Sequence, residues 1–330
     1  MINLSKVLIV GFGSIGQRHF KNIKKLYPNI EIGILRSSNN KKTIAHENVF
    51  FDLKSAIDFN PNIAFICNPA TLHIETAIKL ANEKIHFFVE KPLSNSLDKI
   101  DELKKIIKKN EIKGMVGYNL RFNDSLLFFK QFIEKNNLGD ILFISSTVGQ
   151  YLPAWRPSQD YKKTVSAQSA LGGGALLELS HELDYLIWIF GSPTSVYGKM
   201  MKVSELKIDV EDLVLSNISF NYKSRKIDCA LQLDFLQHKP YRKCKILFKD
   251  GAVIWDGIRN TVELHKEDEC EIIFKSTKER NDSFEKEITE YINCIIEDSS
   301  SPVSVDDGIN VIKLIEGIKL SSKLRKVIDL

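Results

Sequence analysis

"VLIVGFGSIGQRH", which runs from Val7 to His19, is the stretch of this sequence that decides the fold. Its apolar start predicts a buried strand, and three glycines follow in G-x-G-x-x-G spacing where a helix is expected to begin: Gly11, Gly13 and Gly16. The first glycine permits a tight turn, the second lets a backbone approach a pyrophosphate, and the third lets helix and strand pack closely. This order of elements predicts a dinucleotide-binding unit and disfavours a purely structural glycine-rich turn.

The helix behind these glycines is expected to bind the phosphates of the dinucleotide. Ser14 and Ile15 open it, and the first backbone N–H groups of a helix have no acceptor within the helix. Those N–H groups and the positive end of the helix dipole attract phosphate oxygens. We therefore count Ser14 and Ile15, with the three glycines, as cofactor-binding residues.

The next strand ends in a residue that bears on the choice of cofactor. In dinucleotide folds an acidic residue at this place binds the ribose 2′-hydroxyl and repels a 2′-phosphate. This chain has Arg36 there, then Ser37 and Ser38, with Lys41 and Lys42 behind them. The pattern favours NADP(H) over NAD(H), because a guanidinium pairs well with a 2′-phosphate. The alternative is an Arg36 that stacks on adenine or faces water.

Up to residue 121 the chain alternates short apolar runs with amphipathic ones. The apolar runs predict strands at Lys6–Val10, Glu31–Leu35, Ile63–Cys67, His86–Val89 and Gly114–Gly117. Helical spacing predicts helices at Gln17–Leu26, Leu72–Asn82 and Leu97–Lys109. Because this alternation means βαβ units, we expect residues 1–121 to form a Rossmann domain with a doubly wound parallel sheet.

After residue 121 the rhythm changes. A helix at Ser125–Asn136 and a strand in "DILFISSTVGQY" (Asp140–Tyr151) come first. Strands without intervening helices are then predicted at Ser195–Val203, Asp212–Asn221, Lys226–Phe235, Arg242–Phe248, Ala252–Asp256, Thr261–His265 and Glu271–Phe274. Helices near Ser283–Glu297 and Val305–Ser322 close the chain. We expect residues 122–330 to form an α+β domain whose mostly antiparallel, open sheet needs cover, and therefore a homo-oligomer.

The composition is that of an ordinary globular protein. The chain has 330 residues, 43% of them hydrophobic and 27% charged, with a formal net charge of +4. The lysine-rich stretch Asp98–Lys113 interleaves acids and keeps helical spacing, which favours a solvated helix face over a nucleic-acid surface. The sequence contains no apolar run of membrane-spanning length, and its five scattered cysteines fit a reducing cytoplasm. No group of His, Cys and Asp has metal-ligand spacing, so we expect no metal site.

Four further stretches make the sequence resemble a known family. They are "ICNPATLH" (Ile66–His73), "VEKPLS" (Val89–Ser94), "GYNLRFN" (Gly117–Asn123) and "GGGALLELSHELD" (Gly172–Asp184). With the glycine fingerprint they resemble the Gfo/Idh/MocA family of nicotinamide-dependent oxidoreductases over nearly the whole chain. The resemblance implies a Rossmann domain, an α+β domain whose sheet commonly builds the oligomer interface, and sugar or polyol-like substrates.

The resemblance also implies roles for individual residues. Lys91 matches the lysine that reaches the substrate oxygen and the nicotinamide ribose, and His181 matches the histidine that serves as acid and base. Asp184 matches a position near that histidine, and we expect it to contact substrate. The residues matched near the cofactor are Asn68, Pro69, His73 and Glu90. Cys67 is expected to be a packed strand end, because no basic partner adjoins it.

The helix motif departs from the family pattern at one position. An aspartate usually stands four residues before the histidine; here Leu177 stands there, and Glu178 stands three before. Residues at i and i+3 share a helix face, so Glu178, His181 and Tyr185 are expected together on one face of a single helix. The opposite, core-facing stripe comprises Leu176, Leu179, Leu183, Leu186 and Phe190. Glu178 is a candidate to replace the aspartate, and the glycines before the helix are expected to let a ligand approach.

The loop before this helix is rich in polar and aromatic residues, among them Trp155, Arg156, Asp160, Tyr161 and Lys162. This composition fits a carbohydrate or phosphate contact surface and fits an interface loop equally well. We expect Arg156, Tyr161 and Arg121 to contact substrate. Because the two arginines could hold an anionic group, an acidic or nucleotide-activated sugar is among the expected substrates.

The sequence thus predicts an oxidoreductase that transfers a hydride between a nicotinamide and a hydroxyl-bearing or keto carbon of a sugar, with surface-glycan biosynthesis as one setting. Two other functions stay open. A non-catalytic sensor of the same fold should lose the lysine or the histidine, and this chain has both. An enzyme that cleaves glycosides with NAD would regenerate its cofactor in each cycle, so net nicotinamide turnover separates it from the first.

Overall fold

The computed structural model describes residues 4–37, 48–135 and 137–330. The chain divides into two units: unit 1 comprises Met1–Asn119 and Arg280–Ile309, and unit 2 comprises Leu120–Glu279 and Asn310–Leu330. The first crossing between the units lies near the expected boundary at residue 121. The expected second domain also contributes a segment to unit 1, because the chain returns there after its long run of strands.

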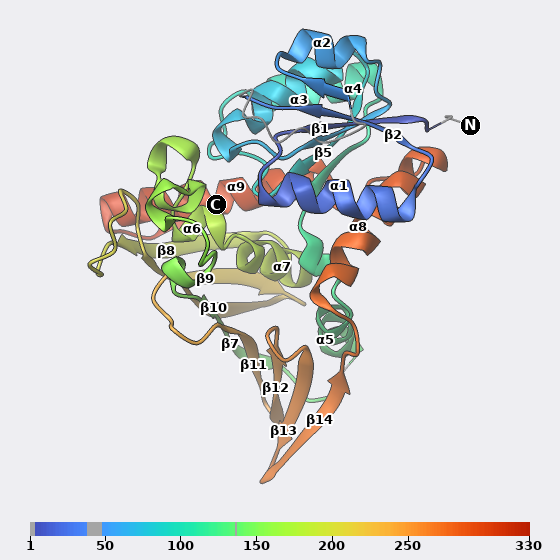
Figure 1. The fold of residues 1–330 in the computed structure, drawn as a ribbon. Helices are drawn as coiled ribbons and strands as arrows, with labels where there is room; N and C mark the ends of the chain where they lie inside the picture. Colours follow the sequence, from blue (N-terminus) through green and yellow to red (C-terminus); the bar gives the residue numbers. More distant parts are fainter. Residues whose placement is uncertain (1–3, 38–47, 136) are drawn as a thin grey trace. The chain divides into compact units, whose positions relative to one another are not determined.

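Unit 1 is built on a six-stranded parallel sheet in the order β3-β2-β1-β4-β5-β6. Its strands are β1 (Lys6–Val10), β2 (Glu31–Leu35), β3 (Asn48–Phe50), β4 (Ile63–Ile66), β5 (His86–Glu90) and β6 (Gly114–Gly117). Its helices are α1 (Ser14–Leu26), α2 (Leu53–Asp58), η1 (Ala70–Leu72), α3 (His73–Asn82), α4 (Ile100–Asn110) and α8 (Arg280–Ile296). Figure 1 shows α3 and α4 on one face of the sheet and α1 and α8 on the other. The doubly wound parallel sheet is confirmed, and β3 and α2 are additions that the sequence did not predict.

The order of the strands reverses between β1 and β4. At such a switch point the connections leave the two strands in opposite directions, and open α/β sheets bind their ligands at the carboxyl ends there. β1 ends at the glycine loop, and β4 ends just before Cys67. Leu8, Ile9 and Phe65 in these two strands are 0% exposed, as expected of strands covered on both faces.

Two of the three fingerprint glycines are required by the packing of unit 1. Gly11 has a φ of +92°, and a Cβ on it would lie 2.8 Å from backbone atoms of Cys67 and Asn68. A Cβ on Gly16 would lie 2.2 Å from the carbonyl oxygen of Gly11. A Cβ on Gly13 would meet no described heavy atom within 4 Å. Gly11 and Gly16 therefore let β1, α1 and the end of β4 approach one another, whereas the packing does not require Gly13.

The helix α8 belongs to unit 1 because one of its faces is buried there. Ile288, Tyr291 and Ile292 are 0% exposed, and the Tyr291 hydroxyl donates to the carbonyl oxygen of Lys113 at 2.9 Å. On the wet side, Lys25 of α1 pairs with Glu285 of α8 at 2.7 Å. The sequence predicted this helix but assigned it to the second domain, because periodicity does not say which sheet a helix covers.

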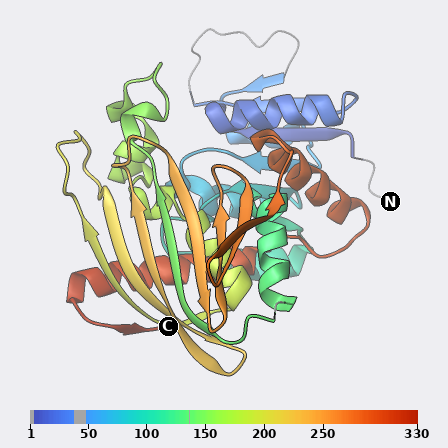
Figure 2. The same ribbon diagram turned by 90° about the horizontal axis from the view of Figure 1, so that it is seen from below.

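Unit 2 is built on a nine-stranded sheet in the order β14-β13-β12-β11-β7-β10-β9-β8-β15 (Figure 2). Its strands are β7 (Ile141–Gly149), β8 (Pro193–Met201), β9 (Leu213–Tyr222), β10 (Arg225–Asp234), β11 (Tyr241–Phe248), β12 (Gly251–Asp256), β13 (Thr261–Lys266), β14 (Glu269–Lys275) and β15 (Ile328–Asp329). The described neighbours in it are antiparallel except for β7 and β10, which run parallel. The mostly antiparallel sheet is confirmed.

The helices of unit 2 include α5 (Asp124–Lys135), α6 (Ala175–Glu178), α7 (His181–Phe190) and most of α9 (Val305–Leu324), which begins in unit 1. Short 3-10 helices lie at Asn119–Phe122 (η2, across the unit boundary), Leu152–Ala154 (η3), Tyr161–Lys163 (η4), Val165–Ala167 (η5) and Ser169–Leu171 (η6). The loop predicted to contact substrate therefore consists of successive single turns rather than a long helix.

The prediction of a single helix around His181 is wrong, because the chain forms two helices, α6 and α7, that are separated at residues 179–180. A break changes the angular phase of a helix, so a face extrapolated across it is not continuous. Tyr185, expected on the polar face with Glu178, is 0% exposed, and its hydroxyl lies 2.6 Å from Ser146 Oγ of β7 in a hydrogen bond. The predicted core stripe is buried throughout: Leu176, Leu179, Leu183, Leu186 and Phe190.

Glycine is required before α6 for a reason other than the expected approach of a ligand. A Cβ on Gly173 would lie 2.3 Å from the carbonyl oxygen of Val165. Gly174 has a φ of +108°, and a Cβ on it would lie 2.4 Å from Glu211 Oε1. That carboxylate accepts a hydrogen bond from the Leu176 N–H at 2.9 Å, at the start of α6. These glycines make room for the chain's own carbonyl and carboxylate groups rather than for a ligand.

Gly16→Ala and Gly13→Ala form a matched pair that tests the packing of the fingerprint. Gly16→Ala should lower the free energy of unfolding by about 2 kcal/mol or more, because its methyl group would overlap a backbone oxygen. Gly13→Ala adds the same methyl group in open space and should cost at most about 1 kcal/mol, the difference between glycine and alanine at a helix N-cap. Urea unfolding measures both, and equal losses would contradict the assignment.

Candidate active site

The loop between β1 and α1 is fitted to bind phosphate. α1 begins at Ser14, no acidic residue stands in its first turn, and Gly13 is exposed. The Gln17 N–H donates to the Gly13 carbonyl at 3.0 Å, so the N–H groups of Ser14, Ile15 and Gly16 precede the first intrahelical bond. The open space at Gly13 fits a group that must approach the backbone closely, as a pyrophosphate does.

Arg36 and Ser37 follow β2, the strand beside β1. The Arg36 N–H donates to a carbonyl of β3 at 2.9 Å, so its backbone continues the sheet. The Arg36 side chain is half-exposed, and Ser37 is exposed. Ser38, Lys41 and Lys42, which belong to the same prediction, lie outside the described residues. The end of this strand is where dinucleotide folds hold the adenosine ribose.

A buried histidine joins the loops after β4 and β5. His73 is 1% exposed, with Nδ1 2.8 Å from the Pro92 carbonyl oxygen and Nε2 2.8 Å from the Asn68 carbonyl oxygen. Burial holds the pKa of His73 below its ordinary value. The Asn68 side chain donates to Thr76 Oγ1 at 3.0 Å, and Pro69 precedes η1. The expectation that the His73 ring binds the cofactor is therefore corrected: its nitrogens face backbone carbonyls, and it holds the two loops together.

Glu90 and Lys91 lie where β5 ends. Glu90 is 8% exposed; its Oε1 is 2.6 Å from His19 Nε2, and its Oε2 accepts a 3.3 Å hydrogen bond from the Lys91 N–H. The expectation that Glu90 binds the cofactor is also corrected, because its carboxylate faces the interior of unit 1. Lys91 is half-buried, and its bond to Pro92 is cis.

Lys91 and the glycine loop share one edge of the parallel sheet. β1, β4 and β5 are successive neighbours, and the carboxyl ends of parallel strands lie on the same edge. Two strand spacings separate the end of β5 from the glycine loop, a distance of about 10 Å. A dinucleotide whose pyrophosphate lies on the loop can therefore extend along this edge towards Lys91.

Cys67 lies between these elements as a packed strand end, as its sequence context suggested. It is 8% exposed, and burial raises the pKa of its thiol well above the ordinary value, with Glu90 and Glu287 adding to the effect. A thiol in this environment stays protonated and does not act as a nucleophile.

Glu178 and His181 occupy adjoining helix ends in unit 2. Glu178 is the last residue of α6 and His181 the first of α7, and both are half-buried. The neighbouring Glu182 is 0% exposed and accepts a hydrogen bond from Arg242 Nε of β11 at 2.9 Å. With the buried contact of Tyr185, this ion pair anchors α7 to its sheet and holds His181 on a fixed helix start.

Arg121 and Asp184 form a buried ion pair in unit 2. The Asp184 carboxylate accepts from Arg121 Nη2 at 2.7 Å and from Nε at 3.1 Å, and the side chains are 5% and 0% exposed. The Arg121 guanidinium also lies 5.5 Å from the ring centre of Trp188. Both residues were expected to contact substrate. The structure pairs them with each other, since a buried charge is stable only beside a partner of opposite sign.

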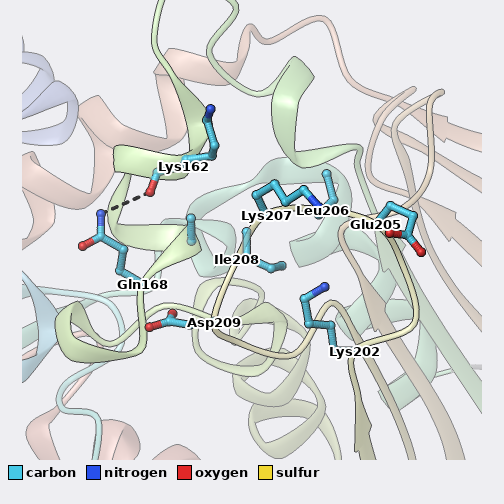
Figure 3. Close-up of a pocket in the computed structure, with 9 residues that line it drawn as sticks. Lys162, Gln168, Lys202, Glu205, Leu206, Lys207, Ile208 and Asp209 are labelled. Carbon is cyan, nitrogen blue, oxygen red and sulfur yellow. Dashed lines mark hydrogen bonds between the residues drawn. The ribbon is translucent and has the colours of Figure 1, made fainter.

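The loop predicted to contact substrate forms one wall of a pocket of about 430 Å³ in unit 2 (Figure 3). Its polar lining comprises Lys162, Gln168, Lys202, Glu205, Lys207 and Asp209. The Tyr161 hydroxyl accepts from the backbone N–H of Lys207 at 3.2 Å, which ties the loop to the segment opposite. Asp209 is already engaged by Ser169, whose backbone N–H donates to it at 2.7 Å. The lining thus carries three lysines and two acids; Lys162 pairs with Asp160 at 3.8 Å, and Lys202 Nζ donates to the Ser204 carbonyl oxygen at 3.0 Å. Arg156 is exposed on the same loop.

Sequence spacing missed two groups of possible donors. His19, Glu90 and Glu287 are distant in sequence and place donor atoms within 4.8 Å of one another in unit 1. Glu263, His265 and Cys270 do so on the β13–β14 hairpin and stand close together in the sequence. The expectation of no metal site rested on spacing, and spacing cannot reveal donors that come from distant segments. The one available signal is a glutamate on the apolar stripe of a helix, which is Glu287. In the part of the chain that the structure describes, no helix is long and apolar enough to cross a membrane.

Comparison with known proteins matches both halves of the chain to one family. Residues 5–118 match the model "Oxidoreductase family, NAD-binding Rossmann fold", and residues 130–330 match "Oxidoreductase family, C-terminal alpha/beta domain". An uncharacterized oxidoreductase, YrbE of Bacillus subtilis, is 26% identical over 91% of this chain and 89% of its own length. The myo-inositol 2-dehydrogenase of Thermotoga maritima is 22% identical over 92% of each chain.

Among solved structures, levoglucosan dehydrogenase in complex with NADH and levoglucosan has the same fold, with a TM-score of 0.84 and 20% identity over 99% of each chain. The family models cover the glycine loop, Lys91 and His181. The chain belongs to the Gfo/Idh/MocA family and is an oxidoreductase that uses a nicotinamide cofactor.

Proposed function

We propose that this protein interconverts a hydroxyl and a keto group on a sugar or polyol, with hydride transfer to or from the nicotinamide. The observation that carries the proposal is the edge of the unit 1 sheet, where the glycine loop and Lys91 stand two strands apart. The sugar and polyol substrates named for the myo-inositol and levoglucosan dehydrogenases support the substrate class.

In the proposed mechanism the chain positions the substrate and moves its proton. The nicotinamide, when bound, supplies the hydride chemistry. The Lys91 ammonium group donates a hydrogen bond to the substrate oxygen and stabilises the charge that develops on it. His181 takes the hydroxyl proton as general base and returns it in the reverse direction. Glu178, at the adjoining helix end, takes the place of the family aspartate and orients His181.

The lining of the pocket in Figure 3 carries three lysines against two acids, Glu205 and Asp209, and this excess of positive charge favours an acidic substrate. We infer that a carboxylate or phosphate of the substrate contacts Lys162, Lys202 and Lys207, with Tyr161 holding the wall of the pocket. Arg156, exposed on the same loop, adds to the positive charge. An acidic or nucleotide-activated sugar has this charge, and such sugars are the substrates of surface-glycan biosynthesis.

His181→Ala should lower kcat for the best substrate in a panel of neutral, acidic and nucleotide-activated sugars by about a hundred- to ten-thousandfold. Lys91→Met should lower kcat by a similar factor, and His181→Ala should keep the wild-type Kd for the cofactor. The readout is net nicotinamide reduction or oxidation at 340 nm; wild-type kcat in His181→Ala would remove the histidine from the mechanism.

Glu178→Gln should shift the pH profile of kcat, measured in the same assay, because a nearby carboxylate favours the protonated imidazole.

We propose that NADP(H) is preferred over NAD(H). Arg36 pairs with the 2′-phosphate and Ser37 donates a further hydrogen bond; a single charge-assisted bond contributes about 1.5–3 kcal/mol, or roughly ten- to a hundredfold in Kd. Arg36→Asp should therefore weaken NADP(H) binding by about that factor and leave NAD(H) binding unchanged or tighter. Calorimetric titration of both cofactors measures this. Tighter binding of NAD(H) by the unmutated protein would rule the preference out.

We propose that the open face of the unit 2 sheet pairs with a second copy of the chain. Tyr197 of β8 and Leu215 of β9 are 47% and 42% exposed on that face, and Ala230 of β10 is in register with Tyr197 across Asn217 of β9. Leu215→Asp should lower the mass measured by light scattering to that of the monomer. Val203→Asp, which places the same charge on an exposed apolar residue outside the strands, is the control and should not. A monomeric wild type would refute the proposal.

A further inference from the structure

Three ionisable side chains from distant parts of the sequence meet inside unit 1. His19 comes from α1, Glu90 from the end of β5 and Glu287 from α8, and their donor atoms lie within 4.8 Å of one another. The three residues are 0%, 8% and 0% exposed. Glu90 connects the cluster to Lys91, because its Oε2 accepts from the Lys91 N–H at 3.3 Å while its Oε1 lies 2.6 Å from His19 Nε2.

The surroundings of the cluster are aromatic and dry. The His19 ring lies 5.3 Å from Phe65, 5.1 Å from Phe88 and 6.4 Å from Phe284, measured between ring centres. The Arg18 guanidinium, the cation that acts on Glu287 from α1, lies 4.5 Å from the Phe284 ring centre. In such an environment two carboxylates cannot both carry a charge without large cost.

Glu287 is the member of the cluster whose surroundings favour a bound proton. Both of its carboxyl oxygens are buried, and no described side chain or backbone group donates to them. Burial and the neighbouring Glu90 raise the pKa of Glu287 well above its ordinary value, and Arg18 lowers it by less. The titratable and charged groups that face it are Arg18 and His19 of α1, Cys67 after β4 and Glu90 of β5. A neutral carboxyl group has an O–H to donate, and the Glu90 carboxylate is the acceptor beside it.

We propose that His19 and Glu287 are positioning residues, which hold the Glu90 carboxylate from two sides so that Glu90 fixes the backbone at Lys91. In this arrangement Glu90 accepts from the His19 N–H, the Glu287 O–H and the Lys91 N–H. The inference rests on the proposed role of Lys91 and goes beyond it, because it gives α8 a function in the reaction. Neither His19 nor Glu287 touches the reacting atoms; both act through Glu90.

The first test concerns the proton and does not depend on activity. If Glu287 is neutral when folded, unfolding above pH 4.5 releases its proton, so the contribution of Glu287 to wild-type stability is fully present below pH 4.5 and falls as pH rises towards the folded pKa. Each pH unit in that window lowers the folding equilibrium constant about tenfold from this group alone. Glu287→Gln is neutral at every pH. It should lower by one the number of protons released on unfolding, as given by the slope of the urea-unfolding free energy against pH between pH 5 and 8.

The matched control for this test is Glu290→Gln, the same change on α8 at a half-buried position outside the cluster. It should leave the pH dependence of stability as in wild type. An unchanged pH dependence in Glu287→Gln would overturn the proposal, since Glu287 would then be ionised in the folded protein. A rise in melting temperature on adding Zn²⁺ or Mn²⁺ to wild type, absent in Glu287→Gln, would overturn it too, because a cation would then hold the cluster.

The second test concerns positioning. Glu287→Gln can still donate a hydrogen bond to Glu90 and should keep kcat within about threefold of wild type, whereas Glu287→Leu should lower kcat about ten- to a hundredfold, the effect of a small displacement at Lys91. The Kd for the cofactor should stay the same in both variants. Equal kcat in the two variants would reduce Glu287 to a packing residue. A wild type without net nicotinamide turnover would refute the proposed function and leave the first test standing.

Discussion

The close approach of Gly16 to the carbonyl oxygen of Gly11 is the contact on which the rest of unit 1 depends. It leaves no room for a side chain, because a Cβ on Gly16 would lie 2.2 Å from that oxygen. The contact holds α1 against β1, so that the first N–H groups of the helix lie at the edge where the parallel strands end. One turn later, the same helix directs His19 into the interior beside Glu90. A single steric constraint thus positions both the glycine loop and the His19 side chain beside Glu90.

Two buried ion pairs in unit 2 orient the helix that carries His181. Arg121 and Asp184 join η2 to α7, and Arg242 with Glu182 joins β11 to α7. Such pairs add little net stability compared with apolar side chains of similar volume, but breaking one leaves an uncompensated charge. Their effect is to restrict the positions that α7 can adopt. The cluster around Glu90 has the same effect on the end of β5.

The predictions from the sequence were accurate wherever a local pattern carried the information. The apolar runs located β1, β2, β4 and β5 almost to the residue, because strands buried on both faces are apolar throughout. The prediction of one continuous helix around His181 was wrong, since nothing in the periodicity marks the break at residues 179–180. The glycines before α6 were misread for a related reason: Val165 and Glu211, which crowd them, are distant in sequence.

By itself, the sequence determined the class of each half of the chain, the glycine loop, the position of Lys91 after a strand and the family, because these depend on residue spacing within one segment. Only the tertiary structure decided that Arg121 and Asp184 neutralise each other, that His73 joins two loops, and that Glu287 of a late helix lies beside Glu90. The physical reason is common to all three. The role of a buried polar side chain depends on which group replaces water as its hydrogen-bond or ion-pair partner, and in these cases that group comes from a distant part of the chain.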